Sequence, residues 1–177
     1  MKEKNVKNKI KFIKGFTLLE LLVVVVIIGI LAAIALPQYK YAVAKSKYNT
    51  LKSAVRSIAD SANRFYLANN TYPKSYGDLD IGFNITFAIS DTSSFSIGFP
   101  NVKHCTVWHD GWNHVMCAKD IMGTEVRYYM TIIPQKPSLC YTKTLDKTDM
   151  YNRLCQQETN KTSEQASCND TYCLYSY

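Results

Sequence analysis

A single carboxylate stands at the edge of the most apolar part of this sequence. Glu20 is followed by 16 residues, from Leu21 to Leu36, without one polar side chain. A charge near the middle of a membrane helix costs roughly 2.5–3.5 kcal/mol, so such a group usually has a partner and a function. The apolar run itself contains no partner for Glu20. The sequence therefore predicts that this carboxylate pairs with a group from elsewhere.

A basic segment precedes the carboxylate. Six lysines and one glutamate lie among the first 15 residues, and the whole chain has a formal charge of +7. Positive residues before an apolar helix stay on the cytoplasmic side, which predicts a C-terminus outside the membrane. Without the basic segment a charge of only +2 remains. That charge predicts no nucleic-acid partner.

The motif around the carboxylate, Lys14-Gly15-Phe16-Thr17-Leu18-Leu19-Glu20-Leu21, resembles the N-terminal signature of the type IV pilin-like family. This family includes pilins, minor pilins and the pseudopilins of type II secretion, and the resemblance extends to about residue 70. It implies that a prepilin peptidase cleaves between Gly15 and Phe16 and that Phe16 is then N-methylated. It also implies that Glu20 neutralises the terminal amine of a neighbouring subunit during assembly.

The resemblance further implies partners and a location. The partners would be other copies of the chain and other pilins in a helical filament, the prepilin peptidase, the inner-membrane assembly platform and the membrane. The chain would cross the inner membrane once, with its C-terminus outside, and would reach a pilus, the cell surface or the periplasm after assembly. No enzymatic activity, catalytic residue, cofactor or metal is expected.

Simple geometry supports a register role for the carboxylate. Cleavage after Gly15 would leave a cationic amine on Phe16, four residues before Glu20. Residues at i and i+4 lie on one face of a helix, so the pair could form within a chain. In a packed bundle it could instead form between chains offset along the axis. A paired buried charge costs far less than an unpaired one.

Four segments follow from this pattern: a removable basic leader at 1–15, a transmembrane and assembly helix at 16–37, an amphipathic helix at 38–70 and a β-rich globular region at 71–177. Gly29 and Pro37 are weak points in the helix, and Pro37 predicts a kink because it removes a backbone donor. Resemblance to pilins suggests that the helix nevertheless continues past Pro37, with local unwinding near Gly29–Pro37 inside filaments.

The second helical segment shows the periodicity of a helix packed on a sheet. Apolar residues recur at three- and four-residue steps at Ala44, Tyr48, Leu51, Val55, Ile58, Ala62 and Phe65. Asn69-Asn70 followed by Tyr72-Pro73 predicts the end of the helix, since Asn tolerates the left-handed conformation and proline cannot continue a helix.

Alternating and β-branched residues predict antiparallel strands after the helix. They lie at 83–89, 95–99, 104–108, 113–117, 125–133 and 172–177, with a short helix around 149–157. A long N-terminal hydrophobic helix whose C-terminal half packs on an antiparallel sheet makes the fold class α+β.

All six cysteines follow the apolar segment, which predicts disulfides in an oxidising compartment. If the turn is Asp110-Gly111-Trp112, Cys105 lies directly opposite Cys117 in a hairpin, within disulfide reach. Cys140–Cys155 is the expected second pair, and Cys168–Cys173 follows by elimination. A swap to Cys155–Cys168 and Cys140–Cys173 stays open.

Competing hypotheses have weaker support. His104, His109 and His114 near two cysteines could suggest zinc, but no ligand spacing typical of zinc occurs. An ordinary signal peptide cleaved after Ala35 fits Ala33-x-Ala35, although Glu20 and the length of the apolar run argue against it. Two more hypotheses stay open: a pseudopilin, and a membrane-tethered enzyme or metal binder with an uncleaved anchor.

Overall fold

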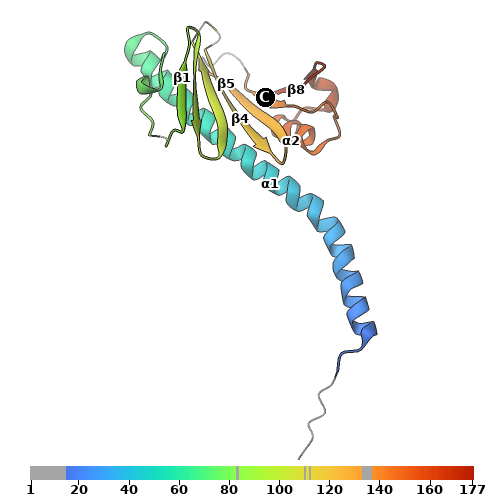
Figure 1. The fold of residues 1–177 in the computed structure, drawn as a ribbon. Helices are drawn as coiled ribbons and strands as arrows, with labels where there is room; N and C mark the ends of the chain where they lie inside the picture. The colour runs from blue at the N-terminus through green and yellow to red at the C-terminus, as the bar shows by residue number, and fades with distance from the viewer. Residues whose placement is uncertain (1–14, 83, 110, 112, 133–136) are drawn as a thin grey trace, which may run out of the picture. The chain divides into compact units, whose positions relative to one another are not determined.

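The computed structural model describes residues 15–82, 84–109, 111, 113–132 and 137–177. The chain divides into two compact units, residues 1–39 and 40–177 (Figure 1). Helix α1, Leu18–Asn69, runs from the first unit into the second and is continuous through Gly29 and Pro37. Continuation past the proline is therefore confirmed, while the predicted kink stays a prediction.

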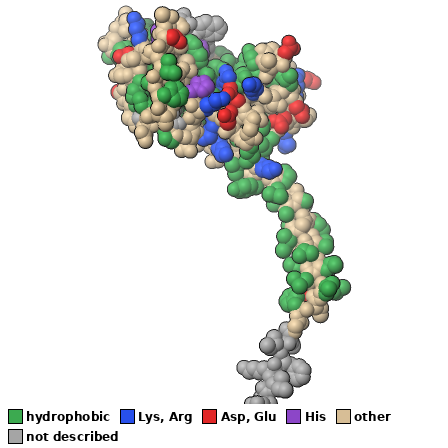
Figure 2. Space-filling view, viewed as in Figure 1, with side chains coloured by type: hydrophobic (Ala, Val, Ile, Leu, Met, Phe, Trp, Pro, Cys, Tyr) green, Lys and Arg blue, Asp and Glu red, His purple; other side chains and the backbone are tan. Residues whose placement is uncertain are grey.

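In the first unit, every large apolar side chain from Phe16 to Leu36 is exposed. Figure 2 shows hydrophobic side chains along this part of the helix. Its most apolar 18-residue window has a mean hydropathy of 3.1 and buries no residue within the chain. Length and composition therefore make this helix able to cross a membrane, and lipid or neighbouring helices would have to cover it.

In the second unit, α1 buries one stripe. Tyr48, Leu51 and Ile58 are fully buried, and Phe65 near the helix end is half-buried. The helix ends at Asn69, as predicted. Asn70 takes a left-handed φ of 54° and donates its N–H to the carbonyl of Tyr66 at 2.7 Å, which satisfies one of the last carbonyls of the helix.

Within the described residues, eight antiparallel strands form one sheet in the order β1-β2-β3-β4-β5-β6-β8-β7. Their bounds are β1 Phe87–Ser90, β2 Ser94–Phe99, β3 Val102–Trp108, β4 His114–Ile121, β5 Thr124–Thr131, β6 Leu139–Thr142, β7 Ser167–Cys168 and β8 Cys173–Ser176. Helix α2, Met150–Thr159, follows β6, and single 3₁₀ turns lie at Tyr76–Asp78 and Ser163–Gln165. The predicted fold class is confirmed.

The first predicted strand is shorter than expected. The sequence predicts a strand at 83–89, but β1 begins at Phe87, and residue 83 lies outside the described residues. Phe87 pairs with Gly98, and β2 ends at Phe99. Beyond this pair β2 has only one more residue, Phe99, so there is little strand left for residues before Phe87 to pair with. The other predicted bounds differ by smaller amounts, apart from β4, which continues to Ile121 and not 117. Strands β6 and β7 were not predicted.

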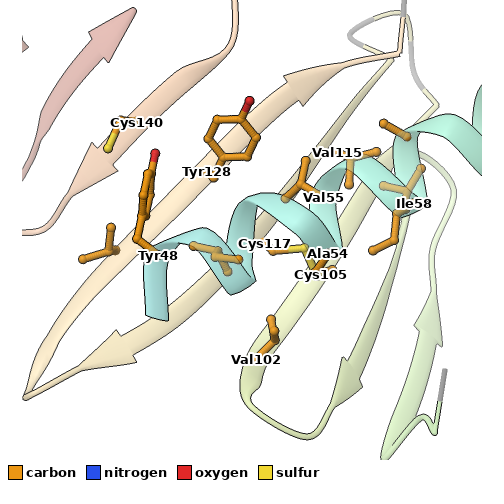
Figure 3. Close-up of a cluster of buried hydrophobic side chains, with 14 of the residues drawn as sticks. Tyr48, Ala54, Val55, Ile58, Val102, Cys105, Val115, Cys117, Tyr128 and Cys140 are labelled. Atoms are coloured by element: carbon orange, nitrogen blue, oxygen red, sulfur yellow. A yellow bond between two sulfur atoms is a disulfide. The ribbon is translucent and has the colours of Figure 1, made fainter. Parts of the chain in front are cut away.

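The core lies between the second half of α1 and the sheet (Figure 3). The Tyr48 ring meets the Tyr128 ring edge to face with centroids 6.1 Å apart, and its hydroxyl lies 3.3 Å from the hydroxyl of Tyr177. Val55 and Ile58 are fully buried in the same cluster. Burying one such aliphatic side chain contributes about 1.5–3 kcal/mol, so this stripe holds the helix on the sheet.

Three disulfides close the sheet region, and their pairing is the one predicted first: Cys105–Cys117, Cys140–Cys155 and Cys168–Cys173. The β3–β4 register places Cys105 directly opposite Cys117, with Cα atoms 4.0 Å apart. Asp110 and Trp112 of the predicted turn lie outside the described residues. The swapped pairing among the last four cysteines is wrong.

Candidate functional site

The carboxylate of Glu20 has a partner within its own chain. Thr17 donates its backbone N–H at 2.9 Å and its hydroxyl at 2.7 Å to Oε2 of Glu20. The N–H of Glu20 donates in return to the Thr17 hydroxyl oxygen at 3.2 Å. With α1 beginning at Leu18, Thr17 is the N-cap and Glu20 the third helical residue. This reciprocal arrangement is a capping box, and it satisfies N–H groups that the first helical turn leaves unpaired.

This geometry adds a local partner that the sequence-based prediction missed, because that prediction considered only the apolar run after Glu20. Thr17 precedes that run, and Thr17-Leu18-Leu19-Glu20 has the threonine and glutamate spacing of a capping box. The local pattern was therefore a sufficient signal. Both hydrogen bonds from Thr17 reach Oε2, and no described residue donates to Oε1. One oxygen is thus left to accept a further donor.

The two residues that flank the predicted cleavage site are open to their surroundings. Phe16 is 73% exposed. A Cβ atom added at Gly15 would meet no atom within 4 Å. The described residues therefore leave the Gly15–Phe16 bond sterically accessible. Residues 1–14 of the leader lie outside the described residues.

A cluster of charged side chains joins α2 to α1 by ion pairs within the second unit. Lys52 donates to Oε2 of Glu158 at 2.7 Å, and Lys45 lies 3.5 Å from the other oxygen. The side chains of Lys52 and Glu158 are only 17% and 11% exposed. Burial alone would raise the pKa of Glu158, but the hydrogen bond from Lys52 and the two positive charges lower it. The Lys52 ammonium also lies 5.1 Å from the Tyr177 ring centroid, which ties the chain end to the helix.

A second charged cluster lies on the sheet. Glu125 at the start of β5 accepts hydrogen bonds from Lys103 and from Nε of Arg127, each at 2.7 Å. Burial alone would raise the pKa of this carboxyl, but the two hydrogen bonds lower it from 4.5 to about 2. Glu125 is therefore charged at neutral pH and balances part of the positive charge beside it.

Because its folded-state pKa is depressed, Glu125 should stabilise the chain above pH 4.5 and lose that contribution as the pH falls toward about 2. In this window the unfolded chain binds a proton that the folded chain does not. After solvent screening we expect about 1 kcal/mol. Thermal unfolding of the wild type and Glu125→Gln between pH 2 and pH 7 measures it, with the difference shrinking on acidification.

Asp120→Asn is the matched control for this prediction. Asp120 lies 3.7 Å from the same Lys103, but its side chain is 58% exposed. Its removal should therefore shift unfolding less than Glu125→Gln does at neutral pH. Parallel pH profiles for the wild type and Glu125→Gln would contradict the assignment. Glu158 is common to both chains and cancels in the comparison.

Comparisons with known proteins find one family motif and several relatives that each match part of the chain. The prokaryotic N-terminal methylation motif matches residues 10–36. A fimbrial protein of Pseudomonas aeruginosa is 40% identical over 77 residues, which is 44% of this chain and 50% of that protein. The type II secretion system core protein G of Pseudomonas aeruginosa is 39% identical over 66 residues, 37% of this chain and 46% of that protein.

A third relative matches a longer stretch of the chain. The type IV major fimbrial protein FimA of Dichelobacter nodosus is 33% identical over 97 residues, 49% of this chain and 62% of that protein. The chain thus spans about half the length of the curated relatives that it matches first. These relatives are named as fimbrial proteins, a major pilin and a secretion core protein. This chain therefore carries the prokaryotic N-terminal methylation motif at residues 10–36 and is homologous to type IV pilins, fimbrial proteins and the type II secretion core protein G.

Proposed function

We propose that this chain is a structural subunit of a type IV pilus or pilus-like filament. It is inserted in the inner membrane with its C-terminus outside, cleaved after Gly15 and N-methylated at Phe16. The observation that carries the proposal is the position of Glu20, three residues inside an exposed apolar helix and within the matched methylation motif. Such a helix has to be covered, first by lipid and then by the helices of other subunits.

Assembly then follows from the two oxygens of Glu20. In the single chain, Thr17 holds Oε2 and keeps the carboxylate hydrogen-bonded at the start of the helix. Cleavage would create an ammonium group on Phe16, and the amine of a neighbouring chain could donate to Oε1. A charge pair in a low-dielectric bundle is strongly attractive and its loss is costly, so it favours one axial offset between subunits.

The proposed segments keep the order given by the sequence. Residues 1–15 are the leader, 16–37 cross the membrane and later pack in the filament, 38–70 form the amphipathic half of the helix, and 71–177 form the globular region. Bending or unwinding at Gly29 and Pro37 would let the helix adapt to its neighbours. The partners are other copies or other pilins, the prepilin peptidase and the assembly platform of the inner membrane.

Mass spectrometry of the N-terminal peptide of the exported protein tests this proposal. We expect a mature chain that begins at N-methylated Phe16. A chain that begins at Leu36 would assign an ordinary signal peptide, and one that begins at Met1 would assign an uncleaved anchor. Either of these results would refute the prepilin assignment.

A pseudopilin is the second candidate, because the type II secretion core protein G matches a stretch of similar length at nearly the same identity. Electron microscopy of surface filaments in a deletion strain, together with a secretion assay, separates the two. Loss of filaments with normal secretion supports a pilus subunit. Loss of secretion with normal surface filaments supports the pseudopilin.

A further inference from the structure

Five aromatic side chains form a continuous row across one face of the sheet. Neighbouring ring centroids are 4.3, 6.0, 6.4 and 4.9 Å apart along the series Trp108, His114, Tyr129, Tyr141 and Tyr172. The first four come from the adjacent strands β3, β4, β5 and β6, and Tyr172 directly precedes β8. Tyr128 packs on Tyr48 of α1, and successive residues of a strand point to opposite faces. The aromatic row, which contains Tyr129, therefore lies on the face of the sheet away from α1.

A pocket of about 390 Å³ opens along this row. This volume falls within the range of about 300–1,000 Å³ that is typical of ligand sites. Arg127, Tyr129, Leu139, Tyr141, Tyr172 and Leu174 are among its lining residues. The guanidinium of Arg127 lies 4.4 Å from the Tyr141 ring centroid, a cation–π contact that fixes both side chains. The aromatic walls are thus held in place before any ligand arrives.

The polar groups of the pocket favour a ligand that accepts hydrogen bonds. No carboxylate is found among the described residues that line it. The hydroxyls of Tyr141 and Tyr172 have no hydrogen-bond partner within the described part of the chain, and each can donate. Arg127 can only donate; its Nε and Nη2 bind Glu125, and its Nη1 donates to the Tyr129 hydroxyl at 3.4 Å.

The charge beside the pocket is balanced. Glu125 accepts from both Arg127 and Lys103, and Lys103 also lies 3.7 Å from Asp120. Two positive side chains therefore face two negative ones. Binding of nucleic acid depends on cations that neutralise phosphates, and the described residues of this surface have no excess of them. A neutral ligand is the better complement.

We propose that this aromatic pocket binds a proline-rich segment of another polypeptide in the polyproline II conformation. Such a segment has carbonyl groups without internal partners, and proline has no N–H that would need an acceptor. Its rings fit between aromatic side chains, and its conformation is already ordered, which lowers the entropy cost of binding. Aromatic walls, hydroxyl donors and the absence of a carboxylate among the described lining residues match these requirements together.

Other ligand classes match the pocket less well. The hydroxyls of a saccharide donate as well as accept, and carboxylates are the strongest acceptors for them. Glu125 is already bound by two cations, and it is not one of the described residues that line the pocket. Single-stranded nucleic acid would stack on the rings, but its phosphates would find no spare cation among the described residues that line the pocket. Both classes serve as competing probes in the test.

The test uses the full chain in detergent micelles and a fluorescein-labelled decaproline peptide, with binding followed by fluorescence anisotropy. We expect saturable binding to the wild type. Tyr129→Ala and Tyr172→Ala each remove one wall of the pocket and should weaken binding at least tenfold. Tyr141→Phe keeps the ring and removes only the hydroxyl, so we expect a loss of about three- to tenfold.

Tyr66→Ala is the matched control. Tyr66 stacks on Tyr72 with ring centroids 4.6 Å apart, and it is not one of the described residues that line the pocket. It should bind within about twofold of the wild type, since it removes no contact to the ligand. Thermal unfolding of each variant identifies one that fails to fold. Tyr141→Phe is the smallest change and keeps the test decisive in that case.

Three results would overturn the proposal. The first is no saturable binding of decaproline by the wild type up to about 1 mM, the weak limit of specific recognition. The second is equal affinity for the wild type, Tyr172→Ala and Tyr141→Phe. The third is displacement of decaproline by maltohexaose or decathymidylate with a tighter dissociation constant, which would assign the pocket to a saccharide or to single-stranded DNA.

Discussion

Replacing Glu20 by valine is expected to abolish filaments while leaving membrane insertion intact. The substitution removes the charge beside the apolar run, and a charge near the centre of a membrane helix costs roughly 2.5–3.5 kcal/mol. The helix therefore becomes easier to insert. The terminal amine of a neighbouring subunit, however, would lose its proposed partner inside the bundle, and an unpaired buried charge destabilises by about 3–5 kcal/mol. Membrane fractionation measures insertion, and electron microscopy of sheared filaments measures assembly.

Two further variants separate the charge of Glu20 from its capping role. Glu20→Gln keeps an acceptor at the third helical position, where glutamine also completes a capping box, but it removes the charge. We expect this variant to insert without forming filaments. Thr17→Val removes the hydroxyl that donates at 2.7 Å and keeps the charge. It should cost about 0.5–2 kcal/mol of helix stability and still allow filaments.

The pattern across these variants decides the role of the carboxylate. Normal filaments from Glu20→Gln would mean that the charge is not needed and that only the cap matters. If Thr17→Val lost its filaments while Glu20→Gln kept them, the cap and not the charge would again be the feature that assembly requires. If Glu20→Val failed to enter the membrane fraction, loss of filaments would report on insertion and not on assembly.

Local sequence patterns predicted the features that depend on neighbouring residues. The β3–β4 register follows from a hairpin with a short turn, and it places Cys105 opposite Cys117. The end of α1 follows from Asn70, which adopts the left-handed conformation at little cost. In both cases the residues that determine the geometry lie within a few positions of each other, so their types and spacing are sufficient.

Features that depend on the order of strands in space could not be read in this way. Strand β8 lies between β6 and β7, although 30 residues separate Thr142 from Cys173 along the chain. The contact between Tyr141 and Tyr172 exists only because of this order. No local spacing indicates it, and the pattern at 172–177 predicts only a last strand and not its neighbour in the sheet. The aromatic pocket therefore became visible in the structure alone.

The capping box at the start of α1 differs from the aromatic pocket, because the sequence contained a complete signal for it. Thr17 and Glu20 stand three residues apart directly before an apolar run. A charge beside so long an apolar run suggests a distant partner, and the prediction therefore did not consider Thr17 as a local partner. In the structure the cap uses only Oε2 of the carboxylate, so the cap is compatible with the proposed assembly role at Oε1.

Replacing Gly15 by alanine is expected to leave the leader uncleaved. The added Cβ would meet no atom within 4 Å, so the substitution should not disturb the described chain itself. Any loss of processing would therefore arise in the peptidase, where a side chain next to the scissile bond has to fit. The uncleaved chain would keep its basic leader and would have no amine on Phe16. Immunoblots should show a single longer form in the membrane fraction, without filaments.

Gly29→Ala is the matched control for this prediction. Gly29 also has open space at its Cβ position, but it lies within α1, away from the cleavage site. Alanine is favoured over glycine in a helix by about 0.8–1.0 kcal/mol, so the helix should form at least as well. We expect Gly29→Ala to be processed at the wild-type rate. A mature Gly15→Ala chain that begins at Phe16 would show that the peptidase does not require this glycine, and the cleavage site would then have to be placed on other residues of the motif.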